Sequence, residues 1–230
     1  MITMKMNRNV ENTYNQINNT LELLKKGNII TYYEIPNVII DTQSGIQNIS
    51  WPNQVSGRSV CGKSFLKLDQ YLSIVKAGAY HALFNDNSIV RCSFSFIDDE
   101  LLSQNLLWWP CPVIVDQDMV NELGLADTVE CLLQDSGACN ILRMRSPVRI
   151  DFDAENDKEN HPRSHMHIQH HECRINTSNP ICFNKFMKHI LINYYPEMSI
   201  DFKHWDYLTY HYKEMHRIKC YYNKTKVNFG

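Results

Sequence analysis

Strict alternation between apolar and polar residues is the feature that most constrains this chain. It occurs at residues 147–153 and again at residues 164–169. A period of two is typical of a strand with one buried face, so we expect the two segments to pair as an antiparallel hairpin. The apolar positions that this hairpin would bury together are Val148, Ile150, Phe152, Met166 and Ile168. A slip by one residue would expose all of them, so the pattern also predicts the register.

The remaining hydrophobic patterns predict a long helix, further strands and a late helix. Residues 8–26 repeat apolar side chains at helical spacing. Residues 79–97 form two β-rich runs around an Asn/Asp turn, and residues 101–109 indicate another strand. Near the end, Asn179 is the expected cap of a helix that Pro196 ends. The prediction is an α+β fold, an antiparallel sheet with an N-terminal helix and a C-terminal helix packed on it.

Length and composition favour one globular unit. The chain has 230 residues, of which 43% are hydrophobic, and a formal net charge of −2. From the length we expect a single domain over residues 1–230. Because the net charge is slightly negative, the molecule as a whole is not expected to bind polyanions in general. No apolar run reaches the ~18 residues of a transmembrane helix. Because the first residues do not resemble a secretory signal and the eight cysteines are scattered, we expect a cytoplasmic protein without membrane contact.

The polar face of the predicted hairpin gathers residues that ligate metals or transfer protons. Arg149, Asp151 and Asp153 would alternate along its first strand, and His165 and His167 along its second. Two imidazoles at this spacing can share one ion. Asp151, His165 and His167 are therefore candidate ligands of a divalent metal that keeps an open position for water. The candidate catalytic residues are Arg149, Asp151, Asp153, His161, His165, His167 and Arg174.

The same residues permit two other interpretations. In a metal-free site, the histidines would exchange protons with a phosphodiester, while Arg149 or Arg174 holds the phosphate and Asp151 orients a histidine. Alternatively, the hairpin faces solvent and forms ordinary cross-strand polar pairs. Both functional versions assume a polar face at the surface, where loss of a histidine costs little stability. The chain has no Gly-rich phosphate loop, Gly-x-Ser-x-Gly or His-Glu-x-x-His motif.

Charge is distributed unevenly along the chain. Residues 92–142 contain nine acidic residues and no Lys or Arg, whereas residues 202–230 contain six Lys or Arg and two acidic residues. Tyrosines are interleaved with the basic residues of this tail, a combination that suits single-stranded nucleic acid. The charge pattern therefore suggests two kinds of partner. One is nucleic acid bound by the basic aromatic tail, and the other is a partner protein steered by the charged surfaces.

A resemblance to a known family rests on the sequence around the hairpin. The segments that carry it are Arg-Ser-Pro-Val-Arg-Ile-Asp-Phe-Asp at residues 145–153, His-Pro-Arg-Ser-His-Met-His at residues 161–167, and Cys-Arg-Ile at residues 173–175. Over about residues 71–195 the chain resembles the uncharacterised bacterial family called domain of unknown function 2290. Members of that family occur among mobile-element and defence genes, so the resemblance implies a toxin or defence role.

Together these features favour an enzyme that acts on nucleic acid. Our leading hypothesis is a nuclease or phosphodiesterase of a bacterial defence or toxin system, with its active face on the hairpin from Arg149 to His167. The alternative is a non-catalytic subunit of such a system, which binds a partner protein or nucleic acid and whose histidines are merely polar. The most informative single observation is whether a structure brings Asp151, His165 and His167 within ligand distance in a concave site.

Overall fold

A long amphipathic helix opens the described part of the chain. The computed structural model describes residues 6–51, 67–134, 137–158, 161–168, 172–198, 200–209 and 211–212. Helix α1 spans Arg8–Lys26, as predicted, and turns one face toward the core. The fully buried apolar residues of that face are Val10, Ile17, Leu21 and Leu24. Gly27 ends the helix, and its N–H returns to the carbonyl oxygen of Leu23.

Within the described residues, nine strands form one sheet, in which every pair is antiparallel. Their bounds are β1 Ile30–Tyr33, β2 Asn37–Ile40, β3 Gln47–Ser50, β4 Ala82–Phe84, β5 Ile89–Ile97, β6 Glu100–Trp109, β7 Val148–Asp153, β8 Ser164–Ile168 and β9 Ile175–Asn176. Strands β5 to β9 lie side by side in chain order. The long β5 pairs on its other edge with β4 near its start and with β3 near its end.

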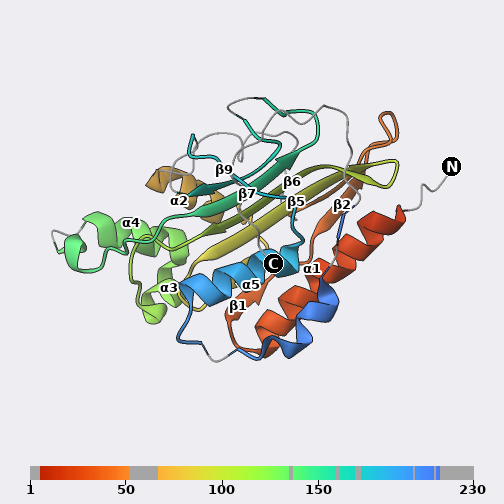
Figure 1. Cartoon of the computed structure of the whole chain (residues 1–230). Helices are drawn as coiled ribbons and strands as arrows, with labels where there is room; N and C mark the ends of the chain where they lie inside the picture. Colours follow the sequence, from red (N-terminus) through yellow and green to blue (C-terminus); the bar gives the residue numbers. More distant parts are fainter. Residues whose placement is uncertain are drawn as a thin grey trace.

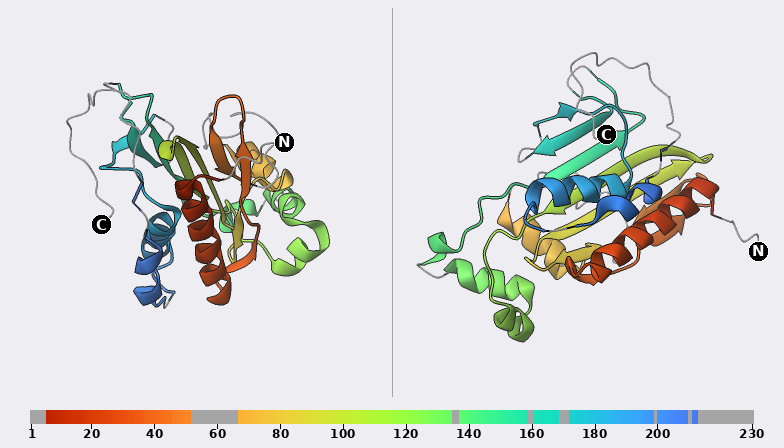
Figure 2. Two further views of the ribbon diagram at one scale, coloured as in Figure 1. Left: turned by 90° about the vertical axis from the view of Figure 1, so that its right-hand side faces the viewer. Right: turned by 60° about the horizontal axis from the view of Figure 1, so that its bottom comes forward.

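Helices cover both faces of this sheet (Figures 1 and 2). Helix α5, Phe183–Tyr194, lies beside α1 on one face, and both helices share a hydrophobic core with Phe94, Trp108 and Ile150 of the sheet. The opposite face carries α2, Leu68–Lys76, and α4, Leu125–Gln134, against Leu107 and Trp109. The short α3, Gln117–Leu123, precedes α4. The predicted α+β fold, with an N-terminal and a C-terminal helix on an antiparallel sheet, is confirmed.

The start of the late helix differs from the prediction. Asn179 was expected to cap it, but Cys182 is the cap residue and α5 begins at Phe183. The carbonyl oxygen of Ile181 accepts a hydrogen bond of 2.7 Å from Nε2 of Gln104 on β6. The Ile181 carbonyl thus has its hydrogen-bond donor on strand β6. The next residue, Cys182, has an extended backbone. A tertiary hydrogen bond therefore outweighs the local capping preference.

Neither a membrane span nor a disulfide occurs in the described part of the chain. None of its helices combines the length and the apolar character needed to cross a bilayer. The cysteines described there form no disulfide with one another, and Cys92, Cys111 and Cys182 are buried. Buried thiols of this kind behave as small core residues.

A fully buried histidine makes the stability of this fold depend on pH. His81, just before β4, accepts a hydrogen bond of 3.2 Å at Nδ1 from the backbone N–H of Cys92. Burial, followed by the charge of Arg91, lowers the pKa of His81 to about 3. The pKa of an unfolded histidine is about 6.5. Because the unfolded chain takes up the proton first, stability from this ring is complete above pH ~6.5 and is lost as pH falls.

We expect His81 alone to lower the free energy of unfolding by about 2 kcal/mol between pH 7 and pH 5. Urea unfolding of the wild type and of His81→Gln at both pH values measures this contribution. The variant should lose about 2 kcal/mol less than the wild type over that interval, because glutamine does not titrate. Equal losses in the two proteins would contradict the assignment of a buried, neutral ring.

Candidate metal centre

The predicted hairpin is present, and its register brings polar residues together. Strand β7 pairs with β8, so that Asp151 lies opposite His165 and Arg149 lies opposite His167. On the other face of the hairpin, the residues that pack into the core under α1 and α5 are Val148, Ile150, Phe152, Met166 and, half-buried, Ile168. The register that the alternation predicts is confirmed.

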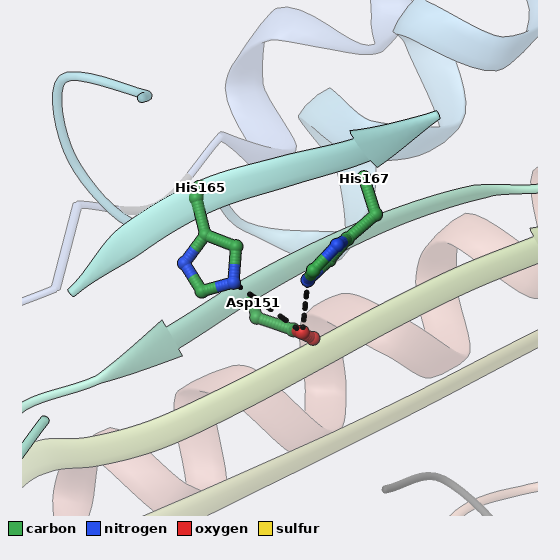
Figure 3. Close-up of side chains that lie close together, drawn as sticks. All are labelled: Asp151, His165 and His167. Atoms are coloured by element: carbon green, nitrogen blue, oxygen red, sulfur yellow. Dashed lines mark ion pairs between the residues drawn. The ribbon is translucent and has the colours of Figure 1, made fainter. Parts of the chain in front are cut away.

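One carboxylate oxygen lies at the centre of the polar cluster (Figure 3). Oδ2 of Asp151 is 3.2 Å from Nε2 of His167 and 3.8 Å from Nε2 of His165. One ligand atom from each of the three residues lies within 4.8 Å of the other two. In a tetrahedral site with metal–ligand distances of 2.0–2.2 Å, ligand atoms are about 3.4 Å apart. Small side-chain rotations would therefore let the three groups share one ion.

The backbone determines the tautomer of His165. Its Nδ1 lies 2.6 Å from the carbonyl oxygen of Pro162, which can only accept, so Nδ1 carries the proton. Nε2 therefore presents a lone pair toward Asp151, and within the described residues this buried atom has no hydrogen-bond partner. A ring N–H bound to a backbone carbonyl is the support that metal-ligating histidines usually have. His165 is thus oriented as a metal ligand through Nε2.

Two further side chains hold the Asp151 carboxylate. An NH2 nitrogen of Arg149 lies 2.9 Å from Oδ2 and also 2.9 Å from Nε2 of His167. Asn105, opposite Asp151 on β6, donates from Nδ2 to Oδ1 at 2.6 Å. According to its tautomer, Nε2 of His167 either accepts from Arg149 or donates to Asp151. Side chains from β6, β7 and β8 therefore fix the orientation of this carboxylate.

The charge states of the three candidate ligands are those that a metal ion requires. Burial tends to raise the pKa of Asp151, but the hydrogen bond with His167 and the charge of Arg149 outweigh it and lower the pKa to about 2. Burial lowers the pKa of His165 to about 4, against the attraction of Asp151, and it also lowers the pKa of His167. At neutral pH the cluster holds one carboxylate and two neutral imidazoles, the forms that ligate metals.

The cluster is buried, which corrects the expectation of a polar face at the surface. The side chains of His165 and His167 are 2% and 1% exposed, and that of Asp151 is 19% exposed. Alternation along a strand shows which residues share a face, but the coverage of that face is decided by the tertiary structure. Loss of either ring would leave a buried gap and polar groups without their partner, so it would cost more than a surface change.

Most of the chain matches the model of one protein family. The family model described as "Uncharacterized conserved protein (DUF2290)" matches residues 30–229. The chain belongs to this family. The match is longer than the region of about 71–195 in which the resemblance was seen, since it also covers β1 to β3 and the tail. Neither the curated proteins nor the solved structures contain a match to the chain.

Two of the other predicted residues of this DUF2290 chain lie beside the cluster. The half-buried ring of His161 packs edge-on against His165, with 4.7 Å between ring centroids. Arg174 directly precedes β9, and its charge contributes to the lowered pKa of His167. Nε of Arg174 is buried and has no hydrogen-bond partner in the described part of the chain. The structure therefore places these two residues close to Arg149, Asp151 and the two histidines that are candidate ligands.

Asp153 and the tail are not part of this arrangement. Oδ1 of Asp153 accepts the backbone N–H of Glu155 at 3.0 Å and so supports the turn after β7. It does not belong to the group of three ligand atoms. Of the basic aromatic tail, the structure describes only residues 202–209 and 211–212, with two short 3₁₀ turns. The nucleic-acid prediction for the tail rests largely on residues that lie outside the described ones.

Sequence reasoning missed two groups that complete the site. Asn105 binds the carboxylate from β6, and the Pro162 carbonyl sets the tautomer of His165. Asn105 lies within a predicted strand, but about 40 residues separate that strand from Asp151. Only the pairing of β6 with β7 reveals the contact. A backbone carbonyl has no residue-type signal, so no pattern in the sequence could have indicated Pro162.

Proposed function

We propose that this chain is a metal-dependent phosphodiesterase that cleaves nucleic acid, with Asp151, His165 and His167 as ligands of one divalent ion. The observation that carries the proposal is the buried lone pair of His165 Nε2, which faces the Asp151 carboxylate at 3.8 Å. The Nε2 lone pair of His165 and the Asp151 carboxylate are both acceptors, and a cation bound between them would satisfy both. Imidazole ligands favour zinc, iron or nickel over magnesium or calcium, so we assign the ion to the transition-metal class.

The surroundings of the three ligands support hydrolysis of an anionic substrate. A site with three protein ligands keeps a position for water, and a bound zinc ion lowers the pKa of such a water to about 7. Arg149 and Arg174 place positive charge beside the ligands. Guanidinium groups bind phosphate oxygens through paired hydrogen bonds. Half-buried His161, in contact with His165, is positioned to carry protons between the site and solvent.

The metal-free version of the same chemistry has less support. A general acid or base works best when its pKa lies near the working pH. Burial instead lowers the pKa of His165 to about 4 and also lowers the pKa of His167. Both rings also direct Nε2 at one carboxylate oxygen, an arrangement suited to ligation. We therefore place the metal version first.

A second candidate function is a non-catalytic subunit that binds a basic partner. Helices α3 and α4 expose acidic side chains at Asp118, Glu122 and Asp127, next to the half-exposed apolar Leu123. Such a surface can attract a positively charged protein. The defence or toxin setting, for either function, is proposed from the family resemblance described above.

Metal binding provides the first test. We expect the purified chain, dialysed against zinc, to retain close to one equivalent by elemental analysis. His165→Gln and His167→Gln should each weaken zinc binding by at least about 100-fold, because each variant removes a ligand and loss of supporting groups alone costs 10–100-fold. His189→Gln is the matched control, since it removes a half-buried ring on α5. Unchanged zinc binding in both site variants would contradict the metal centre.

Cleavage provides the second reading of the same samples. Labelled single-stranded DNA and RNA should be cut by the zinc-loaded wild type and by His189→Gln, and a chelator should stop the reaction. Cleavage that resists the chelator would favour the metal-free version. Zinc binding without cleavage of either substrate would favour the non-catalytic subunit.

A further inference from the structure

We infer that Arg149 couples the binding of the metal ion to the binding of an anionic substrate group. The inference rests on the proposed function and adds its regulation: the ion and the anion bind with positive cooperativity. The guanidinium of Arg149 would make the connection, because it contacts two of the three candidate ligands, Asp151 and His167.

The geometry places Arg149 in competition with the ion. Its NH2 nitrogen is 2.9 Å from Oδ2 of Asp151 and 2.9 Å from Nε2 of His167. These are two of the three atoms to which the ion would bind. A guanidinium and a divalent cation cannot share the same lone pairs, and their like charges repel at such short range. Binding of the ion therefore requires this guanidinium to withdraw from the carboxylate.

Once withdrawn from the carboxylate, the Arg149 guanidinium could bind an anion together with Arg174. Arg174 precedes β9, and a step of one residue in the β8–β9 register places it opposite His167. Arg149 is already opposite His167 on the other neighbouring strand, β7. The two arginines thus flank one histidine, and Nε of Arg174 is a buried donor without a partner in the described residues. Together they form a clamp for a phosphate or sulfate group.

The direction of the coupling follows from this exchange. An ion on Asp151 and His167 releases Arg149 from the carboxylate and makes its donors available to the anion. By reciprocity, an anion that engages Arg149 removes the competitor from the ligands and strengthens binding of the ion by the same factor. The substrate class is therefore a compact anionic group with several acceptor oxygens, as a phosphodiester has.

Zinc affinity, measured by competition with a chromogenic chelator, tests the coupling, with sulfate as the probe anion and chloride to match ionic strength. In the wild type, sulfate should strengthen zinc binding about tenfold, a coupling of typical size. Arg149→Gln should bind zinc about tenfold more tightly without sulfate, because a competing charge is removed, and sulfate should have no further effect. Arg145→Gln is the charge-matched control, since Arg145 pairs with Asp86 instead, and it should behave as the wild type.

Arg174→Gln provides a second test of the coupling in case Arg149→Gln folds poorly. It removes the second half of the clamp and leaves the competitor, so the sulfate effect should disappear. Zinc affinity without sulfate should rise less than in Arg149→Gln, because this change removes a nearby positive charge that acts on His167 but leaves Arg149 on the candidate ligand atoms. Equal zinc affinity and equal sulfate effects in the wild type and both site variants would overturn the coupling and leave the metal centre standing. A wild type that binds no zinc at all would overturn the proposed function itself, and the coupling with it.

Discussion

Asp151→Asn is expected to lower the rate of the proposed nucleic-acid cleavage by at least about 10²-fold. Asp151 supplies the only negative charge among the three candidate ligands, and its carboxylate contacts both histidines, Arg149 and Asn105. Asparagine keeps the shape but removes the charge that would hold the proposed ion, and changes in the support of metal ligands alone cost about 10–100-fold. Initial rates on labelled single-stranded DNA and RNA, at saturating zinc, measure the effect.

Asp153→Asn is the matched control for this experiment. It makes the same chemical change two residues further along β7, at a carboxylate that supports a turn. Because Asp151→Asn leaves the guanidinium of Arg149 without its counter-charge, it will also lower stability, so only samples with a cooperative unfolding transition are compared. Cleavage by folded Asp151→Asn at the rate of Asp153→Asn would refute the catalytic role. If the protein is a toxin, expression of the wild type in a bacterial host should slow growth, and expression of Asp151→Asn should not.

Phe152→Ala is expected to lower the free energy of unfolding by about 3–5 kcal/mol, because truncation of a buried phenylalanine loses its burial and leaves a cavity. Phe152 is 1% exposed and packs in the core beneath α1 and α5. Small domains have a total stability of about 5–15 kcal/mol, so the variant would lose a large share of it. Urea or thermal unfolding measures the change.

The control at this position is Phe152→Leu, which keeps most of the volume and should cost less than half as much as the alanine change. A loss below 1 kcal/mol for Phe152→Ala would show that the ring is not in a well-packed core. Neighbouring positions of one strand thus have separable roles. Substitution of Asp151 is expected to lower chiefly the rate of the proposed cleavage, and substitution of Phe152 is expected to lower the free energy of unfolding.

Much of the fold around the site follows from local patterns. The 3.6-residue spacing of Val10, Ile17, Leu21 and Leu24 predicts α1, because a helix with one apolar stripe must bury it. The alternation in residues 147–153 and 164–169 predicts the β7–β8 hairpin and its register. A period-two pattern can satisfy burial in only one alignment, so a slip by one residue would have exposed the whole apolar set.

Other features required contacts between distant parts of the chain. The start of α5 at Phe183, and not after Asn179, depends on a hydrogen bond from Gln104, 77 residues earlier. Asn105 reaches Asp151 only because β6 pairs with β7. Neither contact has a periodic signal, since the partners belong to separate elements whose order in the sheet is decided by the whole fold.

The sequence by itself determined which residues share the polar face of the hairpin, and hence that Asp151, His165 and His167 lie together. Only the tertiary structure decided that the face is covered, that Pro162 sets the tautomer of His165, and that Arg149 contacts the candidate ligand atoms. The physical reason is that side-chain direction along a strand is a local property of the backbone. Desolvation, and with it the protonation state of a buried ring, depends on everything that packs around it.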